Sequence, residues 1–155
     1  MALIKPFRAV RPRAELASRI AALPYDVYDR EEARKEVERE PESFLQIDRA
    51  ETMCGKETDL YSEEVYRKAH DLLWEKIENG TFVQDEKPCY YLYELVMEGR
   101  SQTGIVACAS IDDYENGIIK KHECTRAEKE QDRICHVDAC DAQTGPIFLE
   151  IGRAS

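Results

Sequence analysis

Long apolar runs are absent from this chain of 155 residues. The longest, at 104–109 and 105–111, are too short to span a bilayer, and the first residues lack the apolar core of a signal peptide. An excess of positive charge is also missing, because 22 basic residues face 32 acidic ones and the formal net charge is −10. This balance disfavours non-specific binding to nucleic acid or to anionic lipid, while a small local anion site stays compatible with it. We therefore expect a cytoplasmic protein without a membrane partner.

Paired cysteines and glycine-rich phosphate loops are absent too. Six cysteines occur without a CxxC pair, at positions 54, 89, 108, 124, 135 and 140. In a chain of this size we expect reduced cytosolic thiols and no disulfide scaffold. Neither GxGxxG nor GxxxxGK[ST] is present, so no standard nucleotide loop is predicted.

Metal and hydrolase chemistry find little support in the pattern of nucleophiles and ligands. Thiolate and imidazole ligands could come from His122, Cys124, Cys135, His136 and Cys140, but their spacing lacks the paired knuckle of a closed zinc site. A Ser/His/Asp or Cys/His hydrolase would need an elbow motif that the chain lacks. No resident metal is therefore predicted.

The first half of the chain carries helix and strand signals in alternation. Residues 3–9 alternate weakly and predict an edge strand, and 14–22 show helical spacing that stops before Pro24. Asp29 and Glu32 stand at capping-box spacing before the charged stretch 30–40. Its many charges predict a solvated helix face rather than a binding patch.

A short strand, a loop and the strongest helix follow. Residues 44–48 predict a strand and the polar stretch 49–60 a mobile loop. A helix is expected from Ser62, with one apolar stripe and a stop at Asn79-Gly80. Trp74 lies on this helix, and we expect it in the core rather than as a stacking platform for bases.

The second half of the chain is richer in β-type sequence. Residues 89–97 and 102–111 predict a hairpin closed at 98–100, and 112–117 predict a second turn. This change of character suggests an N-terminal α/β segment, 1–85, and a hairpin-rich segment, 86–155. We expect an α+β fold with a mixed or antiparallel sheet and flanking helices.

The densest polar segment, residues 120–133, predicts a helix with a basic face. Thr125 and Glu128 form a capping box, and Arg126, Lys129 and Arg133 follow at i, i+3 and i+7 on one face. Together with Lys120, Lys121 and the free N–H groups of the helix start, they would form a small phosphate site. A solvated helix held by its own ion pairs is the alternative.

His122 and Glu123 lie directly before this helix. A carboxylate beside a bound phosphate donor could take the proton of an attacking hydroxyl. Asp112, Asp113 and Glu115 could bind Mg²⁺ together with nucleotide phosphates, although the pattern favours a solvated turn over such a site.

Several ordered motifs resemble the uncharacterised DUF1015 family over essentially the whole chain. The most specific is Lys120-Lys121-His122-Glu123-x-Thr125-Arg126-x-x-Lys129-Glu130-x-Asp132-Arg133. The others are Ile4-Lys5-Pro6-Phe7-Arg8-Ala9, Pro24-Tyr25-Asp26-Val27, Ser43-Phe44-Leu45, Gln102-Thr103-Gly104, Asp112-Asp113-Tyr114-Glu115-Asn116-Gly117 and Ala142-Gln143-Thr144-Gly145-Pro146-Ile147-Phe148-Leu149.

The resemblance implies a fold distantly similar to the ParB/sulfiredoxin-like group, which includes free-serine kinases. In those kinases a His-Glu step precedes a helix, and the Glu is the proposed base for the serine hydroxyl. By that likeness Glu123 would be the base, ATP or ADP with Mg²⁺ the cofactor, and the remaining residues would bind substrate or phosphate: His122, Lys121, Arg126, Lys129 and Arg133. Family members carry a later Asp-Gly-His-His-Arg motif, so we expect this chain to be the N-terminal portion of such a protein, with an incomplete site and a tendency to form homo-oligomers.

Two classes of function remain open. The first is a nucleotide-dependent phosphotransferase acting on a small hydroxyl acceptor. The second is a non-catalytic module that binds a nucleotide as a switch or binds a protein partner, as ParB-like relatives do with nucleotide. The acidic balance argues against a nucleic-acid partner in either class.

Overall fold

The protein forms two compact units, each built from two separate stretches of chain. A computed structural model describes residues 2–120, 126–147 and 149. Unit 1 combines Met1–Ile20 with Glu75–Glu130, and unit 2 combines Ala21–Trp74 with Gln131–Ser155. The division expected near residue 85 thus falls inside unit 1, because composition along the chain carries no information on which distant stretches contact each other.

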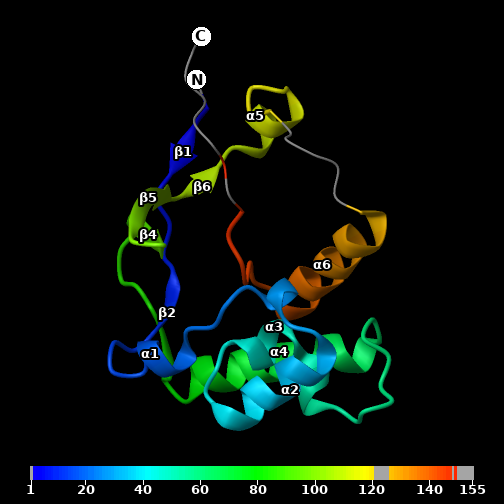
Figure 1. The fold of residues 1–155 in the computed structure, drawn as a ribbon. Coiled ribbons are helices and arrows are strands. Elements are labelled where there is room, and N and C mark those ends of the chain that lie inside the picture. Colours follow the sequence, from blue (N-terminus) through cyan, green and yellow to red (C-terminus); the bar gives the residue numbers. More distant parts are fainter. Residues whose placement is uncertain (1, 121–125, 148, 150–155) are drawn as a thin grey trace. The chain divides into compact units, whose positions relative to one another are not determined.

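Unit 1 contains all the described strands, in three antiparallel pairs (Figure 1). β1 (Ile4–Lys5) pairs with β6 (Cys108–Ala109), and β2 (Val10–Pro12) pairs with β3 (Phe82–Gln84). β4 (Tyr91–Met97) pairs with β5 (Arg100–Val106). Together with the helices, these small sheets confirm the expected α+β class, and among the described residues every pairing is antiparallel.

The hairpin predicted after residue 89 is confirmed. Seven residue pairs join β4 and β5, from Tyr91–Val106 at its base to Met97–Arg100 at its tip. Glu98 and Gly99 close the turn with positive φ angles of 51° and 77°. Two consecutive positive φ angles are typical of a two-residue turn whose twist matches that of the strands.

The N-terminal strand of unit 1 is longer and less regular than predicted. The expected strand at 3–9 becomes β1, an isolated bridge from Phe7 to Cys89, and then β2. The helix expected at 14–22 is reduced to α1 (Ala17–Ile20). The turn expected at 112–117 is partly helical, because the Ser110 hydroxyl accepts from the backbone N–H of Asp113 and caps α5 (Ile111–Glu115).

Unit 2 is helical. Its elements are η1 (Tyr25–Val27), α2 (Arg30–Arg39), α3 (Leu45–Asp48) and η2 (Ala50–Met53), with most of α4 (Glu63–Glu78) and α6 (Ala127–Cys140). A core of Ala33, Val37 and Leu45 joins α2 to α3. The apolar stripe predicted on α4 is buried at Val65, Ala69, Leu72 and Leu73. These stripes bury enough apolar surface to hold short helices together.

The capping box predicted for α2 is confirmed. The Asp29 carboxylate accepts from the backbone N–H of Glu32 at 2.8 Å, and the Glu32 carboxylate accepts from the N–H of Asp29 at 3.0 Å. Both bonds satisfy N–H groups that the first helical turn leaves unpaired.

The strand predicted at 44–48 is wrong, because these residues form the helix α3. Leu45 and Ile47 are both buried, at 1% and 0% exposure. An apolar run this short has the same pattern in a buried helical turn and in a buried strand. The loop expected at 49–60 contains the short helix η2, and Ala50, Glu51 and Thr52 are buried.

Within the part of the chain that the structure describes, no helix combines the length and the apolar character needed to cross a membrane.

Candidate functional site

The helix predicted after the His-Glu step is present as α6 (Ala127–Cys140). Three of the predicted site residues, Lys121, His122 and Glu123, lie outside the described residues, as does the capping residue Thr125. Arg126 stands at the helix start, where its carbonyl accepts from the N–H groups of Lys129 and Glu130.

Arg126 and Lys129 are exposed on the first turns of α6. Among the described residues, neither side chain forms a hydrogen bond or an ion pair. Helix N-termini attract anions through their free N–H groups, and unpaired basic side chains add to that attraction. These two cations are therefore available to a ligand.

Arg133 has a different environment, inside unit 2. Its guanidinium lies over the ring of Tyr25, 4.4 Å from the ring centroid, and its NH2 group is 3.1 Å from the Asp132 carboxylate. Only 30% of the side chain is exposed. The structure therefore engages Arg133 in packing, while Arg126 and Lys129 point to solvent.

A largely buried polar cluster links the second half of α6 to Asp48 of α3. We call Asp48, Arg133, His136 and Cys140 the α6 cluster. His136 Nε2 lies 3.9 Å from the Asp48 carboxylate and 3.8 Å from the Cys140 sulfur. His136 is 3% exposed and Cys140 0%. All four residues belong to unit 2.

Burial shifts the pKa values in the α6 cluster in opposite directions. It raises the pKa of Asp48 to about 6, against the opposing effects of Arg133 and of a hydrogen bond from Thr144. Burial and the positive charge of Arg133 together lower the pKa of His136 to about 4, against the opposing effect of Asp132. Both shifts follow from desolvation, which penalises whichever form carries charge.

The α6 cluster does not have the geometry of a nucleophilic relay. Burial, aided by the charge of Asp48, raises the pKa of the Cys140 thiol to about 11. Cys140 and Asp48 both approach the same nitrogen of His136, whereas a relay needs the nucleophile on one nitrogen and the orienting carboxylate on the other. This arrangement does not activate the thiol.

Two further bonds tie α4 to α6 within unit 2. The Tyr66 hydroxyl donates to Asp132 at 3.0 Å, and the Trp74 indole N–H donates to the Cys140 carbonyl at 3.1 Å. Burial and Asp132 together raise the pKa of Tyr66, so its hydroxyl stays protonated as a donor. Trp74, expected in the core, is half-buried, and its indole N–H is bonded.

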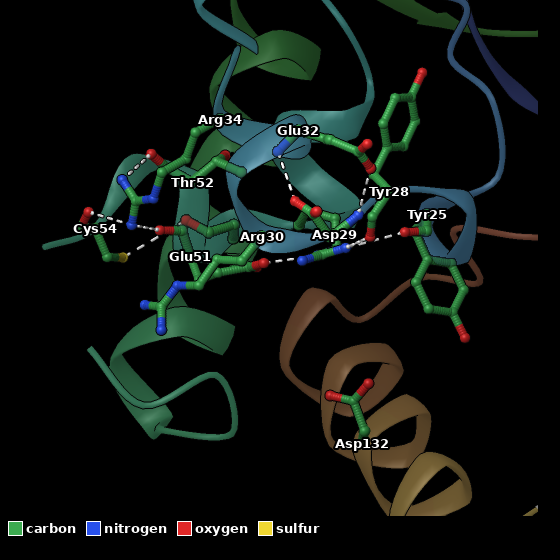
Figure 2. A network of polar contacts seen from close by, with 12 residues as sticks. Tyr25, Tyr28, Asp29, Arg30, Glu32, Arg34, Glu51, Thr52, Cys54 and Asp132 are labelled. Carbon is green, nitrogen blue, oxygen red and sulfur yellow. Dashed lines mark hydrogen bonds and ion pairs between the residues drawn. The ribbon is translucent and has the colours of Figure 1, made fainter. Parts of the chain in front are cut away.

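A second network, which the sequence did not reveal, involves the arginines of α2 and the segment after it. Arg34 donates to the carbonyls of Glu51, Thr52 and Cys54, and Figure 2 shows its guanidinium among them. The charged stretch 30–40 was expected to be solvated throughout. The signal in the sequence for their burial was spacing. Arg30 and Arg34 lie one helical turn apart and close to Ala33, which is buried.

The same network contains a buried ion pair. Arg49 and Glu51 lie 2.6 Å apart, with side chains 15% and 5% exposed. Arg49 also donates to the carbonyls of Tyr25 and Tyr28. Hydrogen bonds to the backbone compensate for the removal of these charges from water.

Metal ligands do not gather anywhere among the described residues, where no group of three or more His, Cys, Asp or Glu side chains could hold an ion. In the acidic segment considered for Mg²⁺, the Asp113 carboxylate accepts a hydrogen bond from the backbone N–H of Leu3 at 2.6 Å.

The fold and the site define a two-unit α+β protein in which exposed basic residues lie at the start of α6. The family "Protein of unknown function (DUF1015)" matches residues 4–154, and the chain belongs to this family. No curated protein and no solved structure shows a significant match to the chain.

Proposed function

We propose that this DUF1015 member is a cytoplasmic, nucleotide-dependent phosphotransferase that acts on a small hydroxyl acceptor such as free serine. One observation carries the proposal: α6 begins at Ala127, four positions after Glu123 in the sequence, and at its start Arg126 and Lys129 are exposed and unpaired among the described residues. Basic side chains at a helix start suit a phosphate group, and a neighbouring carboxylate suits proton transfer. The likeness to free-serine kinases supports the assignment of roles.

In this proposal the acceptor oxygen attacks the terminal phosphorus of ATP. A new O–P bond forms while the bond to the bridging oxygen breaks, ADP leaves, and Glu123 takes the acceptor's proton. Arg126, Lys129, Lys121 and His122 hold the phosphates or the acceptor. Mg²⁺ brought by the nucleotide would offset phosphate charge. Most of the rate enhancement would come from positioning and charge stabilisation.

Binding is tested by calorimetric titration of the chain with ATP, ADP and CTP in the presence of Mg²⁺ at low salt. We expect binding of an adenine nucleotide that Arg126→Ala weakens about tenfold, because one charge-assisted phosphate contact is lost. Arg100→Ala is the matched control, since it removes an exposed cation at the tip of the β4–β5 hairpin and leaves the sequence of α6 unchanged. Equal affinity in both variants would place the nucleotide elsewhere.

Catalysis is tested with Glu123→Gln in a full-length family member. We expect this variant to lose phosphoryl transfer to serine while its affinity for nucleotide is unchanged, because the amide keeps the size of the side chain and cannot accept a proton. Unchanged turnover would remove Glu123 from the mechanism.

A non-catalytic interaction module is the second candidate. It is favoured by the apolar surface of the β4–β5 hairpin, where Leu92, Val96 and Ile105 are 79%, 66% and 66% exposed. Contiguous exposed apolar side chains often mark contact surfaces. The dependence of nucleotide consumption on an acceptor distinguishes the two functions: a kinase consumes ATP only with its hydroxyl acceptor, whereas a switch binds it regardless.

A further inference from the structure

The N-terminal segment of unit 1 pairs along one edge with a partner strand that is interrupted. Backbone hydrogen bonds form at alternate residues of this segment, as they do along one edge of an extended strand. They join Leu3 to Ser110, Phe7 to Cys89, Ala9 to Asp85 and Arg13 to Thr81. The partner is therefore made of two pieces, residues 81–89 and 108–110, and the β4–β5 hairpin is inserted between them (Figure 1).

Cys89 and Cys108 are the two residues on either side of this interruption. Phe7 pairs with Cys89, and Lys5 pairs with Cys108. Lys5 and Phe7 are two residues apart on one strand, a separation of roughly 6.8 Å. Cys108 and Cys89 pair with these two residues along the same edge and are therefore held at a similar separation.

The register of the hairpin leads to the same juxtaposition independently. Its last pair at the base is Tyr91–Val106. If the antiparallel register continued two residues beyond this pair, Cys89 would lie opposite Cys108 at a Cα separation of about 4.5–5.5 Å. The cross-strand separation lies inside the range of about 4.4–6.8 Å that a disulfide accepts between Cα atoms, and the separation along the strand lies at its upper limit.

The two side chains also share a face and are accessible. Residues two apart on a strand point to the same side, so the partners of Lys5 and Phe7 lie on one face of the ribbon. Both cysteines are free and exposed, and Cys89 is held only by a 3.4 Å bond from its thiol to the Lys87 carbonyl among the described residues. The other described cysteines, Cys54, Cys135 and Cys140, belong to unit 2.

We propose that Cys89 and Cys108 form a reversible disulfide at the base of the β4–β5 hairpin when the protein meets a peroxide. One thiolate attacks hydrogen peroxide and becomes a sulfenic acid, with release of water after proton uptake. The second thiol then attacks that sulfur, the S–S bond forms, and a second water leaves. In total, two thiols are oxidised and one peroxide is reduced to two waters.

The bond would close residues 90–107 into a loop and hold both pieces of the partner strand beside the N-terminal segment. The hairpin has little other support, since among its residues 92–105 all are exposed. Closing the loop restricts opening of the hairpin. This modification site is separate from the proposed phosphate site and does not depend on it.

The test is peroxide treatment of the full chain, blocking of remaining thiols, and tryptic mapping. Cleavage after Arg100 places Cys89 and Cys108 on different peptides, 77–100 and 101–120. We expect these peptides to be joined, with loss of two hydrogens, and to separate again with dithiothreitol. Cys89→Ser and Cys108→Ser should each abolish the link, and Cys135→Ser, the matched control, should retain it.

Hydrogen exchange provides the second readout. In the oxidised protein we expect greater amide protection in residues 90–107 than in the reduced protein, and no gain in the Cys89→Ser variant. The proposal is overturned if the mapped link joins any other pair of cysteines. It is also overturned if Cys89 or Cys108 passes to sulfinic acid unlinked, or if oxidation leaves exchange in the hairpin unchanged.

Discussion

At Asp48 and His136, burial acts on two neighbouring ionisable side chains with opposite consequences for stability. The folded protein holds the pKa of Asp48 at about 6, above its usual 3.8, so acidification through this range stabilises the fold. It holds the pKa of His136 at about 4, below its usual 6.5, so acidification destabilises the fold over that range. The two effects largely offset each other between about pH 6 and pH 4.

In the variant Asp48→Asn, nothing from Asp48 should offset the effect of His136 on the pH dependence of stability. We expect the free energy of unfolding of this variant to fall by about 2 kcal/mol more than that of the wild type between pH 6.5 and about pH 4, because only the unfolded state then gains a proton over that range. Urea denaturation at a series of pH values measures this difference.

The control is Asp71→Asn on α4. Asp71 contacts His70 at 3.0 Å, but both side chains are largely solvent-exposed, at 62% and 43%. An exposed pair contributes little to stability, so the pH dependence should match that of the wild type. If Asp48→Asn behaves in the same way, burial does not control the titration of the α6 cluster.

Among the elements, the β4–β5 hairpin depends most on its turn. Gly99 has a φ of 77°, a conformation that side chains with a Cβ adopt reluctantly, while no other atom lies within 4 Å of the position a Cβ would take. The cost of a substitution there is therefore conformational rather than steric. Because this turn also sets the register of the strands, strain there affects the whole hairpin.

Gly99→Ala should destabilise the hairpin by about 1 kcal/mol. Gly104→Ala is the matched control: Gly104 lies in β5 without a positive φ, and a Cβ there would make ordinary contact with the Tyr93 carbonyl at 4.0 Å. Hydrogen exchange of residues 91–106 should therefore accelerate in the first variant and stay unchanged or slow down in the second. Equal exchange in the two variants would contradict the turn geometry.

At the scale of the whole molecule, repulsion due to the net charge of −10 acts against association of copies through the exposed apolar side chains of the hairpin. Like charge keeps copies of the chain apart at low salt. Added salt shortens the distance over which that repulsion acts. Leu92 and Ile105 are paired across the strands and remain exposed. Self-association should consequently depend on salt and on this pair.

We expect sedimentation to show a larger average mass at high salt than at low salt, and the double variant Leu92→Thr, Ile105→Thr to weaken this effect. Ile111→Thr is the control, because Ile111 is similarly exposed, at 74%, but lies on α5. Association that persists unchanged in the double variant would assign the contact to another surface.

Signals that act over a few residues were enough to predict several elements. The capping box at Asp29 and Glu32, the stripe of α4 and the alternation of β4 and β5 all depend on neighbours within one or two turns. The helix after the His-Glu step was predicted for the same reason. The roles assigned to Lys121, His122 and Glu123 stay predictions, since these residues lie outside the described part of the chain.

The amino-acid sequence by itself determined the α+β class, the hairpin and the start of α6, because periodicity and capping are local properties of the chain. Only the tertiary structure decided that 44–48 is helical, that Arg133 packs on Tyr25, and that Arg34 binds backbone carbonyls. Each of these outcomes depends on a partner far away in sequence, whose burial and hydrogen bonds outweigh local preference. The same holds for the pairing of Cys89 with Phe7 and of Cys108 with Lys5, residues that lie more than eighty positions apart in the sequence.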